Sequence, residues 1–448
     1  MTPRPYQLRT LDACRDHFRA GKRAVLVVAP TGSGKTCMGA EMTRGQVERG
    51  GRVVWLVHRR ELVTQSVRTL LDLGLDVGWR GREVEAPVQV CTIQALVAAR
   101  EVPDDIRLVI VDEAHHMAKG GLWAELVRTY LRARARLVGL TATPARADDS
   151  ALEGFDAIVV AAQIGELQRL GHLVALKIKR PGHLLKPDKI AQRPVDAYLE
   201  HARGRSAVVF APHVKAAEEY ASDFRGLGIA AEVVTAKTKP DVRVAASVRF
   251  CKGELQVLVG VGVFTEGWDA PICSCVILGR GCGSISLLRQ MTGRGLRPSP
   301  GKSDCLLLDL RGVTHAFGRP DEDCIYALEG SGIALARPIA GPRLCRVCQL
   351  PLGDLLVCPE CSAEHDLVTP AATGEKLVDY DEVAHEAVKS VMRPRRDVLS
   401  LSGMIVKYGE AKGLAMFRHI FKRDGGSILG LARAFNRSKA SARAAFDG

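Results

Sequence analysis

A short run near the amino terminus combines residue types that bind phosphate. The run is Ala29-Pro30-Thr31-Gly32-Ser33-Gly34-Lys35-Thr36, and it directly follows the apolar residues Ala24 to Val28. Glycines let a backbone fold closely around an anion, and the first N–H groups of a following helix would point at that anion. In such a loop the lysine reaches the outer phosphates of a nucleotide, and the threonine hydroxyl binds Mg²⁺. The run therefore predicts a site for a nucleoside triphosphate with Mg²⁺.

Two adjacent acids follow a second apolar run. Leu108 to Val111 leads into Asp112 and Glu113, which are followed by Ala114 and His115. A strand that ends in two acids would place both at the carboxyl edge of a parallel sheet, where ligands bind. There Asp112 would hold the Mg²⁺ that Thr36 also holds, and Glu113 would polarise the water that attacks the terminal phosphate. An acidic helix cap is the alternative for the pair taken alone.

The elements that would position these residues form two series of short apolar runs. Valine, leucine and isoleucine dominate each run, and helix-like stretches separate them, which is typical of a parallel sheet covered on both faces. The first series is Ala24–Ala29, Val53–Val57, Leu108–Val111 and Leu137–Leu140; the second is Ala207–Phe210, Glu232–Thr235, Val257–Val259, Cys275–Leu278 and Cys305–Leu308. We therefore expect an α/β fold with two domains of similar build, at residues 1–176 and 195–325. Residues 177–194, which are rich in lysine and proline, should form a linker.

Net charge and apolar content indicate which partners and which cellular location to expect. The 448 residues carry 63 Lys and Arg against 50 Asp and Glu, a net charge of +13, which favours a polyanionic partner. No apolar run approaches the ~18 residues of a membrane-spanning helix, and the first residues lack the apolar core of a signal peptide. We expect a cytoplasmic protein with reduced thiols and no membrane partner.

The motifs, taken in order, resemble a superfamily 2 helicase of the DEAH-box kind. The resemblance runs from Arg4 to Arg297 and implies two RecA-like domains with ATP bound between them. By this resemblance Arg4 and Gln7 belong to the adenine-reading element, in which Gln7 reads the base, and His115 belongs to the hydrolytic motif. Thr141-Ala142-Thr143-Pro144 resembles the motif that couples the nucleotide and nucleic-acid sites.

The same resemblance assigns further roles in both domains. It implies that Gln290, Arg294 and Arg297 belong to the last motif, whose arginines reach the terminal phosphate. Gly267 and Asp269 lie in the motif Thr265–Pro271, which links nucleotide to strand. The residues expected to contact the nucleic-acid backbone are Arg59, Thr92, Gln94 and Thr265. The run after the last motif and the downstream cysteines are most similar to RadD-like helicases of bacterial DNA repair.

Four cysteines form two close pairs beyond the second domain. Cys345 and Cys348, and then Cys358 and Cys361, make two Cys-x₂-Cys turns. Four thiolates with this spacing close a tetrahedron around structural Zn²⁺. Reducing conditions disfavour a disulfide pair, while an iron–sulfur cluster stays open as an alternative. We expect a small zinc ribbon at residues 340–366.

The last segment, residues 385–448, is basic and mainly helix-like. From Val388 to Phe446 it has 13 Lys or Arg and 3 Asp or Glu, which gives 13 − 3 = +10. Phe417 and Phe421 among these cations could stack nucleic-acid bases, or they could form a small core behind a solvated face. Residues 427–446 resemble a helix-turn-helix.

The residues and the resemblance together predict an ATP-dependent DNA helicase or translocase that acts in repair or recombination. Its expected cofactors are ATP, Mg²⁺ and Zn²⁺, and its expected partners are DNA and other repair or recombination proteins. RNA is not excluded, because backbone contacts barely distinguish the two polymers. Two more hypotheses stay open, which are a zinc-bearing DNA-binding adaptor that uses ATP as a switch and the motor component of a restriction or defence system.

Overall fold

The structure is a computed structural model of the 448-residue chain. It describes residues 3–58, 60–79, 86–92, 95, 105–116, 135–144, 152–264, 268–328, 333–334 and 370–380. The two large sheets belong to one compact unit, Met1–Asp379. We call each sheet with its helices a lobe.

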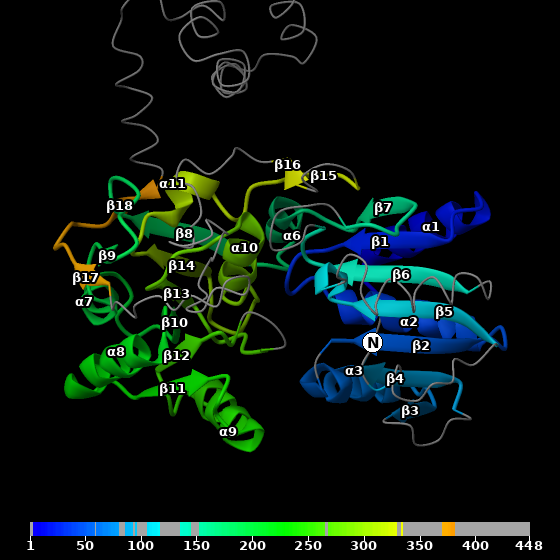
Figure 1. Cartoon of the computed structure of the whole chain (residues 1–448), viewed down its shortest axis with the longest axis horizontal. Coiled ribbons are helices and arrows are strands. Elements are labelled where there is room, and N and C mark those ends of the chain that lie inside the picture. Colours follow the sequence, from blue (N-terminus) through cyan, green and yellow to red (C-terminus); the bar gives the residue numbers. More distant parts are fainter. Residues whose placement is uncertain are drawn as a thin grey trace, which may run out of the picture. The chain divides into compact units, whose positions relative to one another are not determined.

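The sheet of the first lobe has seven parallel strands in the order β3-β4-β2-β5-β6-β1-β7 (Figure 1). Its strands are β1 (Ala24–Val28), β2 (Arg52–Val57), β3 (Val77–Trp79), β4 (Val88–Thr92), β5 (Ile106–Asp112), β6 (Arg136–Thr141) and β7 (Ala157–Val160). All four apolar runs predicted for this lobe are strands. The predicted phosphate-binding run therefore follows β1, and the acidic pair lies at the end of β5, at the same edge of the sheet.

Apolar side chains fill both faces of this sheet. One face packs against helices α1 (Pro5–Arg19), α2 (Lys35–Val47) and α3 (Arg60–Asp72) through a buried cluster that includes Val25, Trp55 and Leu140. The other face carries a second cluster, which includes Leu26 and Val111. Burial on both faces explains why the strands are continuously apolar and not alternating.

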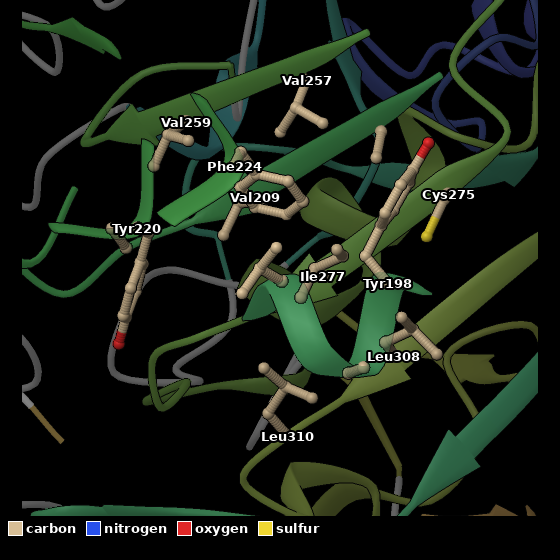
Figure 2. Close-up of a cluster of buried hydrophobic side chains, with 14 of the residues drawn as sticks. Tyr198, Val209, Tyr220, Phe224, Val257, Val259, Cys275, Ile277, Leu308 and Leu310 are labelled. Carbon is tan, nitrogen blue, oxygen red and sulfur yellow. The ribbon is translucent and has the colours of Figure 1, made fainter. Parts of the chain in front are cut away.

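The sheet of the second lobe repeats this plan in the order β11-β12-β10-β13-β14-β8-β18. Only β18 is antiparallel to its neighbour. The strands are β8 (Ala175–Arg180), β10 (Ala207–Phe210), β11 (Ala231–Thr235), β12 (Val257–Val261), β13 (Cys275–Leu278), β14 (Asp304–Asp309) and β18 (Val378–Asp379). Figure 2 shows the core against one face of this sheet, where Tyr198 and Phe224 meet edge to face with centroids 5.5 Å apart.

The remaining described elements are short or lie between the strands. The helices are η1 (Ala114–His116), α6 (Ile164–Arg169), α7 (Pro194–His201), α8 (Val214–Gly226), α9 (Pro240–Cys251), α10 (Ile285–Gly293) and α11 (Val313–Phe317). Two small sheets pair β15 (Ile325–Tyr326) with β16 (Ile333–Ala334), and β9 (Lys189–Ile190) with β17 (Ala371–Ala372). In the part of the chain that the structure describes, no helix has the length and apolar character needed to cross a membrane.

The linker predicted at residues 177–194 is wrong for its first residues. Lys177–Arg180 belongs to β8, which pairs in parallel with β14 as an integral strand of the second sheet. Leu176 and Ile178 are buried while Ala175 and Lys177 are exposed. The lysines of this alternating strand therefore face solvent, and their number gave the segment the composition of a linker.

Replacing either of two glycines of α2 with alanine should change the free energy of unfolding in opposite directions. A Cβ on buried Gly39 would lie 2.6 Å from Trp55 Cη2 and 2.8 Å from Leu140 Cδ1, so Gly39→Ala should lower the free energy of unfolding by about 1–3 kcal/mol. A Cβ on Gly45 would meet only the guanidinium nitrogens of Arg49, at 3.9 Å. Gly45→Ala should therefore raise the free energy of unfolding by up to about 1 kcal/mol. Urea unfolding checks both, and equal shifts would contradict the packing around Gly39.

Candidate functional site

One cavity of about 620 Å³ collects side chains from both lobes. Its volume lies in the range of small-molecule sites. Twelve of the predicted site residues line it, which are Arg4, Gln7, Thr31, Gly32, Gly34, Lys35, Thr36, Asp112, Glu113, Asp269, Arg294 and Arg297. The cavity therefore brings together residues that lie far apart in the sequence.

The loop between β1 and α2 has the backbone of an anion cradle. Gly32 and Gly34 adopt positive φ angles of 84° and 78°, which side chains with a Cβ rarely adopt. Helix α2 begins at Lys35, and the Lys35 ammonium group lies 3.4 Å from the Ala29 carbonyl. The Ser33 hydroxyl is fully buried and, within the described residues, has no hydrogen-bond partner. A buried polar group without a partner fits a loop that closes around phosphate.

The start of α1 is tied to this loop by side-chain hydrogen bonds. The Gln7 amide donates to the Ser33 carbonyl at 3.1 Å, and its oxygen accepts from the Arg4 N–H at 2.8 Å. The Tyr6 hydroxyl also donates to the Ser33 carbonyl. A Cβ on Gly34 would lie 2.6 Å from the Gln7 amide nitrogen, so a glycine is needed at this position. Gln7 therefore joins the predicted adenine-reading element to the phosphate loop. Tyr6 was not singled out from the sequence.

The two acids at the end of β5 lie in different environments. Burial raises the pKa of Asp112, as does the neighbouring Glu113, while Lys35 acts in the opposite direction. Glu113 has a positive φ of 51°, unusual for a residue with a side chain. An ionised Asp112 carries an unfavourable free energy in this site, and a cation between Asp112 and Thr36 would relieve it. The pair therefore fits Mg²⁺.

The two arginines of the second lobe share one acceptor. Arg294 donates to the Trp268 carbonyl at 2.8 Å, and Arg297 donates to the same oxygen at 3.1 Å. Arg297 also pairs with Asp269. Both arginines also line the cavity, so their guanidinium groups lie where a ligand could contact them.

Lys302 holds the backbone next to the two arginines through hydrogen bonds to carbonyl groups. Its ammonium group donates to the carbonyls of Pro271, Cys273 and Arg297 at 2.9, 2.6 and 2.7 Å. Burial lowers the pKa of Lys302. Three carbonyls saturate the three donors of an ammonium group, so Lys302 fixes the ends of two motifs against each other. The sequence placed Lys302 after the last motif but gave no signal of this role.

His115 connects the acidic pair to both lobes. Its Nδ1 lies 3.1 Å from the Thr141 hydroxyl, and that hydroxyl donates to the Thr143 carbonyl at 2.7 Å. Because the Thr141 proton is used there, Nδ1 is the donor to Thr141 and Nε2 carries the lone pair that can accept. Nε2 lies 3.3 Å from the amide nitrogen of Gln290 in α10. Neither His115 nor Gln290 lines the cavity, but their contact joins the two lobes beside it.

His116, the residue directly after His115, is part of a ring stack. Its ring lies 3.8 Å from that of His58, at the end of β2, and 4.3 Å from that of His115. The stack therefore connects the end of β2 with η1, directly after the acidic pair. Two adjacent histidines after the acids were the only sequence signal.

Several predicted residues are not brought into the cavity. Pro30 and Ser33 lie in the loop but do not line it, and Thr92 lies at the end of β4. The predictions for Arg59, Gln94, Thr265, Gly267, the four zinc-binding cysteines and the basic tail fall outside the described residues. Within the described residues, no group of three or more His, Cys, Asp or Glu could hold a metal ion. The zinc site stays a prediction.

Comparison with known families agrees with the arrangement of the two lobes. Residues 1–146 match the family described as type III restriction enzyme, res subunit, and residues 190–299 match the helicase conserved C-terminal domain. The chain belongs to superfamily 2 of the helicases. This assignment rests on the two matched domains taken together.

Two of the curated relatives come from a fungus and a phage. The helicase is 32% identical, over 68% of its length, to a Schizosaccharomyces pombe protein named as the mitochondrial ATP-dependent helicase irc3, and it spans 57% of that protein. It is 29% identical, over 66% of its length, to a 51.5 kDa protein of a Lactococcus phage, of which it spans 67%. The helicase thus covers little more than half of the first relative.

Solved structures share the fold. A fragment of an HsdR subunit of a type I restriction enzyme from Vibrio vulnificus aligns with a TM-score of 0.58 at 21% identity, over 71% of the helicase and 66% of that chain. The DNA-bound type ISP restriction-modification enzyme LlaBIII aligns with a TM-score of 0.53 at 15% identity, over 70% of the helicase and 28% of that chain. These likenesses support two RecA-like lobes.

The histidine stack predicts a coupling defect. Replacing His116 with leucine removes the flat ring between His58 and His115, so nucleic-acid stimulation of ATP hydrolysis should fall several-fold while basal hydrolysis changes little. His116→Phe keeps a flat ring and should restore most of the stimulation. The control is His183→Leu, at an exposed position in the second lobe. Equal stimulation in His116→Leu and the control would contradict a coupling role.

Proposed function

We propose that the chain is an ATP-driven DNA translocase or helicase of the DEAH-box, RadD-like kind that acts in repair or recombination. The observation that carries the proposal is the single cavity lined by Lys35 and the acidic pair from one lobe and by Arg294 and Arg297 from the other. Such an arrangement allows a nucleotide to attract both lobes at once.

The proposed roles follow from where the side chains lie. Bound ATP with Mg²⁺ would supply the phosphoanhydride bond whose cleavage releases free energy. Lys35 holds the outer phosphates, while the Thr36 hydroxyl and the Asp112 carboxylate hold the cation. Glu113 accepts a proton from the attacking water.

The arginines act from the opposite side of the cavity. Arg294 and Arg297 exchange part of their contact with the Trp268 carbonyl for the phosphate charge that develops during hydrolysis. Loss of that charge from the cavity weakens the attraction between the lobes. Because His115 joins Thr141 and Gln290 across the lobes, this change reaches the surfaces proposed to hold the nucleic acid.

The motor of a restriction or defence system is the second candidate. The match of residues 1–146 to the type III restriction res subunit favours it. In such a system the cutting activity would be supplied by a separate nuclease subunit. An RNA substrate and a zinc-bearing adaptor that uses ATP as a switch are the remaining outcomes that an activity assay would distinguish.

Removal of one arginine tests the proposed catalytic arrangement. Arg294→Ala should leave affinity for a non-hydrolysable ATP analogue within a few-fold, because Lys35 and the loop remain. It should lower ATP turnover by ~10³–10⁵, the usual contribution of an arginine that faces the transferring phosphate. Arg203→Ala, at an exposed position of the second lobe, is the control. Thermal unfolding should verify that Arg294→Ala is folded, and unchanged turnover would refute the role.

The substrate class is tested with the intact chain. ATP turnover is measured with single-stranded DNA, duplex DNA, forked DNA and RNA at two salt concentrations, followed by strand separation on the best activator. DNA should stimulate more than RNA of the same sequence, and higher salt should weaken the effect because phosphate contacts dominate affinity. Stronger stimulation by RNA would reassign the substrate. Turnover near zero with saturating DNA and RNA would favour the adaptor.

A further inference from the structure

A second hollow lies at the opposite edge of the first sheet from the nucleotide cavity. It measures about 530 Å³. We call it the arginine basin, and its lining residues are Arg15, Phe18, Arg19, Gln46, Arg49, Arg107 and Arg136. The lining thus contains five arginines and, within the described residues, no acid.

The basin is built from elements that meet at the starts of the strands (Figure 1). The carboxyl-terminal half of α1 and the end of α2 contribute one part of its wall, while β5 and β6 contribute Arg107 and Arg136 from their first residues. β5 is 7 residues long, and a strand rises ~3.3 Å per residue, so about 20 Å separates this edge from Asp112. The basin is therefore distinct from the nucleotide cavity.

Local irregularities in the backbone make room for Arg107. The register between β2 and β5 shifts from Arg52–Ile106 to Val53–Leu108, so Arg107 is the extra residue of a β-bulge. A bulge redirects a side chain from its regular alternation. A Cβ on Gly51 would lie 2.1 Å from the Gln46 amide nitrogen and 3.1 Å from Arg107 Cβ, so the glycine leaves space for both residues.

Helix dipoles explain only part of this concentration of charge. Arg19 lies in the last turn of α1, where the partial negative charge of a helix end favours cations. Arg107 and Arg136 lie on strands, where that explanation does not apply. Arg136 is placed over the ring of Phe18, with its guanidinium carbon 5.2 Å from the ring centroid. An aromatic face and a guanidinium group thus meet inside the hollow.

The positive charge of the basin is only partly compensated. Arg15 and Arg19 pair with Asp12 and Asp16 on the surface of α1, where solvent weakens ion pairs. For Arg49, Arg107 and Arg136, no carboxylate among the described residues lies within ion-pair distance. Like charges gathered in a hollow repel one another, and an anion bound among them would relieve the repulsion.

We infer that the arginine basin binds the phosphate backbone of a nucleic-acid segment that extends beyond the part held by the two lobes. Every cation in the lining is an arginine, whose planar group forms paired hydrogen bonds with phosphate. Phe18 adds a ring on which a base can stack. The choice of a nucleic acid over an acidic protein segment rests on the proposed function, because that function places a long polyanion on this molecule.

The test compares short and long single strands. A strand of about 10 nucleotides is within the usual site size of a single-strand binding surface, and one several times longer can also reach the second edge. The variant Arg49→Gln with Arg107→Gln removes two charges from the basin. The control, Arg203→Gln with Lys252→Gln, removes two charges from exposed positions of the second lobe. Fluorescence anisotropy at several salt concentrations gives affinities and salt slopes.

The basin variant should bind the long strand several-fold more weakly than the control, with a salt slope lower by about 1.4, the value for two lost phosphate contacts on a single strand. Its affinity for the short strand and its stimulation by that strand should equal those of the control. Equal long-strand affinity in the two variants would overturn the proposal. A matching loss of short-strand affinity would also overturn it, because the basin would then belong to the motor's own site.

Two further measurements separate this inference from others. The first measurement is binding of poly-glutamate to the unmodified chain and to the basin variant. If the basin variant loses poly-glutamate binding but keeps its affinity for the long strand, the occupant is an acidic protein and the proposal is wrong. If neither strand stimulates ATP hydrolysis but the basin variant still loses long-strand affinity, the proposed motor function fails while the basin stands. Arg136→Gln provides an independent variant if the double substitution lowers the melting temperature.

Discussion

The candidate site depends on cationic and acidic side chains from two lobes that line one cavity. Lys35, Arg294 and Arg297 line it together with the acidic pair, and burial raises the pKa of Asp112 there. Cations from both sides and a carboxylate that is costly to ionise favour a ligand that carries phosphate and a divalent cation together. The cavity is therefore electrostatically suited to a nucleotide with its metal, and neither lobe alone provides that combination.

The contacts around the cavity explain how a movement of its side chains would be transmitted to the backbone of both lobes. Gln7 holds the phosphate loop from α1, and Lys302 holds the carbonyls of Arg297 and Pro271 from the other lobe. His115 contacts Thr141 and Gln290, so the end of β5 is linked to both. Each of these side chains joins two segments that are far apart in sequence. A shift of the arginines would therefore move backbone in both lobes.

Much of the fold could be predicted from sequence because it depends on local patterns. The apolar runs became strands, and the loop before Lys35 and the acids after β5 lie at one edge, as short-range rules predict. The sequence was misleading at β8, where the lysine content hid the alternating pattern of a strand. It was silent where the role of a residue depends on a contact with another residue far away in the sequence. His116 stacks on His58, and Lys302 donates hydrogen bonds to three carbonyl groups. No local sequence pattern reveals either contact. The expected zinc and tail segments lie outside the described residues.

The two edges of the first sheet illustrate why topology decides what a residue can do. Parallel strands put all their carboxyl ends on one edge, where loops and helix starts collect anion-binding N–H groups. The other edge collects helix ends, which attract cations, and strand starts, which here carry Arg107 and Arg136. The same chain direction therefore produces a phosphate cradle made of backbone at one edge and a hollow made of guanidinium groups at the other. On the proposed function, a protein that moves along a polyanion would gain a second contact at that edge without a change in its catalytic cavity.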